Sequence, residues 1–121
     1  MAHAKITSGG NLSTYVIDSA SVTATSENNV LGTGGTLFGV YIDNTANSAI
    51  TYLRLWNDAS PTTGTTEPHE IYPCPASVAR MFTIALGTQY TSAISFACVR
   101  EAGKIGATSP ASAVKVRLLV S

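Results

Sequence analysis

The stretch Val114-Lys115-Val116-Arg117-Leu118-Leu119-Val120, near the end of the chain, decides the class of fold. Apolar residues at positions 114, 116, 118 and 120 alternate there with Lys115 and Arg117. Because successive side chains of a β-strand point to opposite faces, this stretch predicts a strand with one face in the core and the other in water. No segment longer than about ten residues keeps the apolar spacing of an amphipathic helix. We therefore expect an all-β protein.

Alternation or short β-prone runs predict further strands upstream, at residues 14–18, 21–26, 36–43, 50–56, 70–72, 78–86 and 93–100. About eight strands with turns between them predict an antiparallel β-sandwich that is jelly-roll-like. A polar turn separates 36–43 from 50–56, so these two strands are expected to pair as a hairpin. Bulky and small residues alternate in 78–86, which predicts a strand packed on both sides with Arg80 at its edge.

The length of 121 residues predicts a single domain, which we place at residues 13–121. Residues 1–12 carry Gly9-Gly10 and no alternation, so we expect an extended N-terminal arm. Ile6 is the one substantial apolar residue before the glycines, and it is a candidate contact with a neighbouring subunit or a shell.

The composition excludes several classes of protein. Charged residues make up 12% of the chain and the formal net charge is zero, which argues against a nucleic-acid partner. The longest apolar stretch, Ala93 to Val99, is far shorter than the roughly 20 residues of a membrane-spanning helix, so no membrane partner is expected. The first residues do not have the pattern of a secretory signal. We expect Cys74 and Cys98 to be reduced, buried thiols, although one disulfide between them remains an alternative.

The sequence offers little for catalysis. Its two histidines are His3, in the expected arm, and His69, which we interpret as an exposed loop residue. No Gly-x-Ser-x-Gly motif is present, and the glycines of 32–39 lack the spacing and the following helix of a nucleotide-binding loop. We therefore expect a protein that is not an enzyme, with no catalytic residues and no cofactor.

Potential metal ligands gather in one region but without a ligand pattern. Asp58, Glu67, His69, Glu70 and Cys74 lie near one another in sequence, yet none of them forms a paired spacing such as Cys-x-x-Cys. A solvated loop and a buried thiol explain the same residues, so no metal site is expected. Ca²⁺ bound by Asp58 and Glu67 is the alternative that remains open.

The strand at 50–56 has an unusual face. Tyr52, Arg54 and Trp56 share it, and such side chains contribute strongly to protein interfaces. They could form a subunit contact, a platform for sugar rings, or a cap on the core. The loop that follows, residues 57–68, is long and rich in turn formers, and adds Pro61, Thr62 and Pro68 as candidate contacts.

From Gly35 onward the chain resembles small β-rich virion proteins of tailed bacteriophages. The resemblance lies in the order of short strand and turn sequences. These are Tyr-Ile-Asp-Asn-Thr at 41–45, Tyr-Leu-Arg-Leu-Trp at 52–56, the Ser-Pro-Thr-x-Gly-Thr-x-x-Pro loop at 60–68, the apolar strand at 80–86, and Thr-Ser-Pro at 108–110 before the last strand. Some proteins of this kind are capsid decoration, or cement, proteins that sit as trimers outside the head.

The resemblance implies a capsid decoration protein that stabilises the outer surface of a phage head. It implies a homo-oligomer, most simply a trimer, whose partner is the major capsid protein. Such a protein would be made in the host cytoplasm and located on the outer capsid surface of the virion. The candidate contacts are then Ile6, Tyr52, Arg54, Trp56, Pro61, Thr62 and Pro68. The alternative is a carbohydrate-binding or host-attachment module of a tail or fibre, with a surface glycan as its partner.

Overall fold

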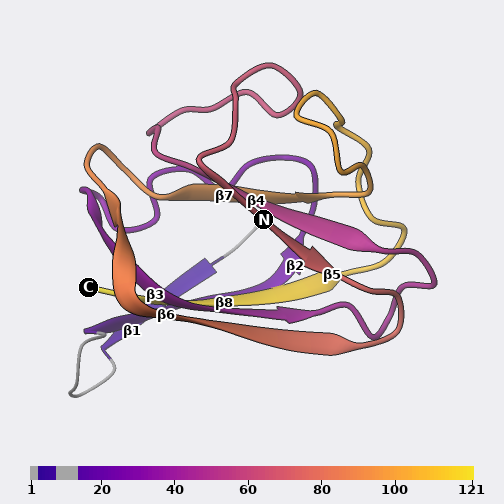
Figure 1. The fold of residues 1–121 in the computed structure, drawn as a ribbon, viewed down its shortest axis with the longest axis horizontal. Coiled ribbons are helices and arrows are strands. Elements are labelled where there is room, and N and C mark those ends of the chain that lie inside the picture. Colours follow the sequence, from indigo (N-terminus) through magenta and orange to yellow (C-terminus); the bar gives the residue numbers. More distant parts are fainter. Residues whose placement is uncertain (1–2, 8–13) are drawn as a thin grey trace.

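The computed structural model describes residues 3–7 and 14–121, and for residues 6 and 7 the backbone alone (Figure 1). The described chain is all-β, with eight strands in two antiparallel sheets that face each other as a sandwich. The strands are β1 (His3–Thr7), β2 (Tyr15–Val22), β3 (Gly35–Asp43), β4 (Thr51–Trp56), β5 (Glu70–Cys74), β6 (Ala79–Tyr90), β7 (Ser95–Val99) and β8 (Val114–Val120). Within the described ranges there is no helix that could span a membrane.

The strand order places neighbours from distant parts of the sequence side by side. The five-stranded sheet has the order β1-β2-β8-β3-β6, and the three-stranded sheet has the order β5-β4-β7. The segment 23–30 runs along the outer edge of β7: Glu27 and Phe96 exchange backbone hydrogen bonds of 2.8 and 3.0 Å, and the Cys98 amide donates to the carbonyl of Thr23 at 2.9 Å. This segment covers the edge of the smaller sheet.

The core lies between the two sheets, and β8 confirms the alternation predicted for it. Val114, Val116, Leu118 and Val120 are buried, whereas Lys115 and Arg117 are exposed. The apolar side chains of β8 face the smaller sheet. Because side chains alternate along a strand, the charged side chains of β8 must lie on the outer face of the larger sheet.

The predicted hairpin between 36–43 and 50–56 is wrong. β3 pairs with β6 and β8, and β4 pairs with β5 and β7, so the two strands belong to different sheets. The turn between them crosses the sandwich. It is held by the buried Asn44, whose Nδ2 donates to the carbonyls of Ala49, Cys74 and Pro75 at 3.0, 3.2 and 3.0 Å.

Three other expectations about strands need correction. The strand expected at 21–26 is not a separate element: residues 21 and 22 end β2, and the chain then runs beside β7. Residues 3–7, placed in an unpatterned arm, pair with β2 as an edge strand whose described side chains are exposed. β6 is not packed on both sides: it is the other edge strand, with Phe82 and Ile84 toward the core and Met81 exposed.

The two cysteines are buried free thiols, as expected. Burial raises the pKa of both thiols, so neither is disposed to form a thiolate near neutral pH.

Candidate functional site

The outer face of the three-stranded sheet is occupied by the chain's own loops. Arg54 projects from this face in the middle of β4 and is 0% exposed. Its guanidinium donates to four backbone carbonyls of one loop, those of Glu101, Gly103, Lys104 and Gly106. Desolvation lowers the pKa of Arg54, while the charge of Glu101 opposes that shift. Arg54 therefore organises the 101–106 loop from inside.

Trp56 is held in a similar way by the loop that follows β4. Its indole Nε1 donates to the carbonyl of Thr66 at 2.9 Å, and the side chain is 1% exposed. The prediction that Arg54 and Trp56 belong to an exposed contact face or a sugar platform is therefore wrong for these two residues. The reason is that two long loops fold back over β4 and cover the side chains on its outer face. Tyr52, on the same face, is half-buried.

The remaining predicted contacts differ in how exposed they are. Pro61 is buried, and its carbonyl accepts a hydrogen bond from the Ser26 hydroxyl at 3.3 Å. Thr62 is exposed and Pro68 is half-buried. The side chain of Ile6 lies outside the described part of the structure. Pro68 lines a hollow of about 340 Å³ together with Trp56, whereas Tyr52, Pro61 and Thr62 are not among its lining residues.

Glu70, one of the potential ligands, joins the two sheets at one side of the sandwich. It accepts hydrogen bonds from Tyr72 at 2.8 Å, Tyr90 at 2.6 Å and Thr88 at 3.2 Å. Burial, followed by these interactions with Glu70, raises the pKa of both tyrosines. His69 is exposed at the surface, and its ring packs edge-on against Tyr90 with centroids 4.7 Å apart.

The acidic residues of the long loop have local partners. The carboxylate of Asp58 accepts a hydrogen bond from the amide of Ser60 at 2.8 Å, and that of Glu67 pairs with Lys104 at 2.7 Å. Within residues 3–7 and 14–121, no group of three or more His, Cys, Asp and Glu side chains could hold a metal ion.

A buried carboxylate that sequence reasoning missed lies beneath β2. Glu27 is 4% exposed, and its Oε2 accepts a hydrogen bond from the Ser19 hydroxyl at 2.7 Å. Nδ1 of His3 lies 3.4 Å from its Oε1. Desolvation raises the pKa of Glu27, and the hydrogen bond from Ser19 and the charge of His3 partly oppose this. No periodicity predicts this site, because Glu27 lies in the irregular segment beside β7.

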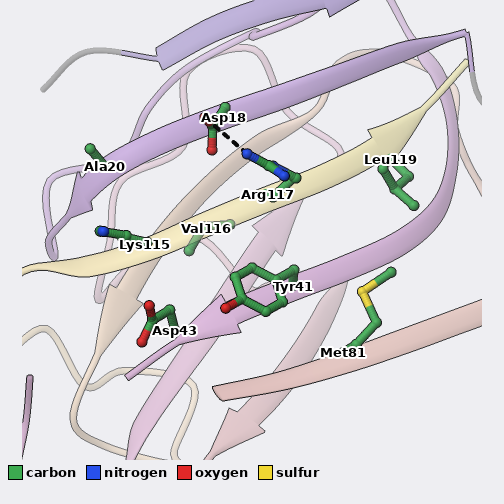
Figure 2. A pocket seen from close by; sticks show the side chains of 9 residues that line it. All are labelled: Asp18, Ala20, Tyr41, Asp43, Met81, Lys115, Val116, Arg117 and Leu119. Carbon is green, nitrogen blue, oxygen red and sulfur yellow. Dashed lines mark hydrogen bonds and ion pairs between the residues drawn. The ribbon is translucent and has the colours of Figure 1, made fainter. Parts of the chain in front are cut away.

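A hollow lies on the outer face of the five-stranded sheet (Figure 2). Its volume is about 620 Å³, within the usual range of small-molecule sites. The hollow results from the register of the strands. Asp18 of β2 is opposite Arg117 of β8, Arg117 is opposite Tyr41 of β3, and Tyr41 is opposite Met81 of β6. One row of side chains thus crosses four strands.

The charges of the hollow come in opposite pairs. Arg117 donates to the carboxylate of Asp18 at 3.4 Å. Asp43 is opposite Lys115 in the sheet. Hydrogen bonds from the Thr45 hydroxyl and amide, with a smaller contribution from Lys115, hold the pKa of Asp43 below its usual value. Two carboxylates therefore face two cations across the hollow.

The base of the hollow depends on the absence of a side chain at Gly39. A Cβ there would lie 2.9 Å from Cδ1 of Leu119 and 3.1 Å from Cε of Met81. The missing side chain lets Leu119 and Met81 extend over β3 from either side. The outward position of Leu119 follows from the alternation in β8, whereas the exposure of Met81 and its approach to Leu119 were not predicted and depend on the strand order.

Searches against protein-family models, curated proteins and solved structures found no match. A proposal for the function of this chain therefore rests on its residues and geometry, together with the resemblance noted above.

Proposed function

We propose that this chain is a non-enzymatic virion structural protein, a capsid decoration subunit that stabilises the outer surface of a phage head. In this proposal it assembles as a homotrimer and binds the major capsid protein. Three copies around an axis match the local three-fold positions of an icosahedral shell. The proposal combines the resemblance in strand and turn vocabulary with one structural observation, the open edge of β6.

The four sheet edges differ in how they are protected. Residues 23–30 cover the edge of β7, and Pro73 interrupts the donor pattern of β5. β1 is five residues long and carries an exposed Lys5. Short strands, proline and lysine are the usual devices that keep edge strands from pairing with other chains.

β6 has none of these three devices, although it does contain a bulge. It is twelve residues long, and from Met81 to Tyr90 it contains neither a charged residue nor a proline. Leu86, which lies outside the hollow described above, is 94% exposed. An edge of this kind favours association with another protein surface.

A bulge in β6 determines how Leu86 is presented. Leu37 is opposite Thr88 while Gly39 is opposite Thr83, so β6 contains extra residues at this point of the ladder. The bulge pushes Leu86 into solvent and protects the ladder there from simple strand addition. Covering the Leu86 side chain in an interface would contribute about 2 kcal/mol.

The strand order supports a finer form of the fold, which we include in the proposal. If residues 23–30 count as a strand beside β7, the larger sheet contains β2-β8-β3-β6 and the smaller sheet contains 23–30, β7, β4 and β5. This interleaved order is that of a jelly roll with an added edge strand, β1. Jelly rolls are frequent among viral capsid domains and also among lectins, so the fold supports the proposal by association alone.

The proposal is tested first by oligomeric state and then by particle binding. We expect light scattering after size exclusion to give a trimer at micromolar concentration, and Leu86→Glu to shift the protein toward the monomer. Ile105→Glu is the matched control, because Ile105 is 80% exposed in a loop away from β6. Leu86→Glu should also co-sediment with phage heads that lack the decoration subunit to a smaller extent than the wild type does. A monomeric wild type, or equal effects of the two substitutions, would contradict the proposal.

The attachment-module alternative loses the platform that suggested it. That alternative placed a glycan against Tyr52, Arg54 and Trp56, and two of these side chains are covered by loops. We do not propose a second function from that face.

A further inference from the structure

The hollow on the outer face of the larger sheet contains an aromatic platform. Figure 2 shows the Tyr41 ring nearly face-on when the sheet itself is seen face-on, so the ring lies flat along the strands. The ring is half-buried, and no described group forms a hydrogen bond with its hydroxyl. A flat, partly exposed aromatic ring packs well against the C–H face of a sugar ring, because the aromatic face is apolar and carries partial negative charge, which attracts the C–H groups.

Apolar side chains extend the platform toward β6. Leu119 and Met81 approach each other over Gly39, and Met81 is opposite Tyr41 in the sheet. Together these residues form an apolar floor within a hollow that is open to solvent.

Polar groups border the floor with balanced charge. Asp18 and Asp43 offer acceptors, and Arg117 and Lys115 offer donors. Arg117 makes one hydrogen bond within the described chain, to Asp18, which leaves further guanidinium N–H groups directed to solvent. Because the four charges sum to zero, the hollow favours neither an anion nor a cation. A neutral ligand with many hydroxyl groups uses both the donors and the acceptors.

We propose that this hollow binds a neutral oligosaccharide, with one sugar ring stacked on Tyr41 and its hydroxyl groups bonded by Arg117 and Asp43. The site is on the opposite sheet from the Tyr52 face, and it does not depend on the decoration role. A decoration subunit with this site would give the particle surface an affinity for glycans.

The test is an NMR titration of the isotopically labelled protein with cellotriose, maltotriose and chitotriose, with sialyllactose as an anionic comparison. We expect at least one neutral trisaccharide to shift the amides of Tyr41, Met81 and Arg117 with a Kd of about 1 mM or tighter. Tyr41→Ala should weaken that binding at least about tenfold. Ile105→Ala is the control, because it removes an exposed apolar side chain outside the hollow, and it should leave the Kd within about twofold.

Each other outcome overturns the proposal. Shifts with sialyllactose alone would make this an anion site, and no shift with any sugar at about 10 mM would exclude a saccharide site of this strength. Shifts of the same amides on protein dilution, without sugar, would make the face an interface between copies of the chain. Because the wild-type titration maps the site directly, the test does not depend on whether the Tyr41 variant folds.

Discussion

Replacement of the buried Arg54 by methionine is the sharpest test of how this fold is held together. Methionine keeps a long, unbranched side chain but removes the charge and every donor. The carbonyls of Glu101, Gly103, Lys104 and Gly106 then lose their shared partner. We expect the 101–106 loop to detach from β4 while the two sheets stay paired.

The expected change in the free energy of unfolding combines one loss with two effects that reduce it. A hydrogen bond to a charged group contributes about 1.5 to 3 kcal/mol, so four of them give a gross loss of about 6 to 12 kcal/mol. The loss is reduced because the freed carbonyls reach water when the loop opens, and because a charge no longer has to be buried. A net loss of about 3 to 5 kcal/mol remains, which is a large part of the roughly 5 to 15 kcal/mol that stabilises a typical domain.

The assay is equilibrium unfolding in urea followed by the fluorescence of Trp56, combined with amide hydrogen exchange. At a slope of about 1.5 kcal/mol per molar urea, the midpoint should fall by about 2 to 3 M. Exchange should accelerate over residues 101–109. Arg54→Lys, which keeps the charge but not the planar fork of donors, should cost less and provides a measurement if the methionine variant does not fold. A loss below about 1 kcal/mol, with unchanged exchange in the loop, would refute this account of Arg54.

Two further predictions concern buried positions. Because burial raises the pKa of Glu27 in the folded state, the native protein binds more protons than the unfolded chain above the ordinary value of 4.5. The free energy of unfolding should therefore fall as pH rises through the raised pKa, by up to about 1.4 kcal/mol per pH unit. The Glu27→Gln variant should lack this decline: its free energy of unfolding should match that of the wild type near pH 4 and exceed it near pH 8. If the free energies of unfolding measured in urea for the two proteins changed in parallel with pH, the role assigned to Glu27 would be wrong. Val116→Asp should cost several kcal/mol (~3 or more), because it places an unpaired carboxylate in the core, whereas Arg117→Asp on the exposed parity should cost far less in the same measurement.

The predicted all-β sandwich and most of its strands are confirmed, and the reason is local. The alternation in β8 depends on the two-residue period of a strand, so it identifies both the strand and its buried face without knowledge of any partner. The prediction of reduced, buried thiols at Cys74 and Cys98 is also confirmed, and cysteine is among the residue types most often found in protein cores.

Which strands pair was decided by tertiary structure. β3 and β4 are adjacent in sequence and joined by a turn that suits a hairpin, yet each finds its neighbours elsewhere, because the Asn44 hydrogen bonds carry the chain from one sheet to the other. The hollow around Tyr41 exists because β2, β8, β3 and β6 are brought side by side from widely separated parts of the chain.

The environment of Arg54 shows the same limit at the level of one side chain. Arg54 lies between Tyr52 and Trp56 on the polar face of a predicted strand, and this position in the sequence indicates an exposed residue. The loop that buries it lies 47 to 52 residues further along the chain. Periodicity reports which side chains share a face of a strand. What covers that face depends on contacts between distant segments, which form only when the whole chain folds.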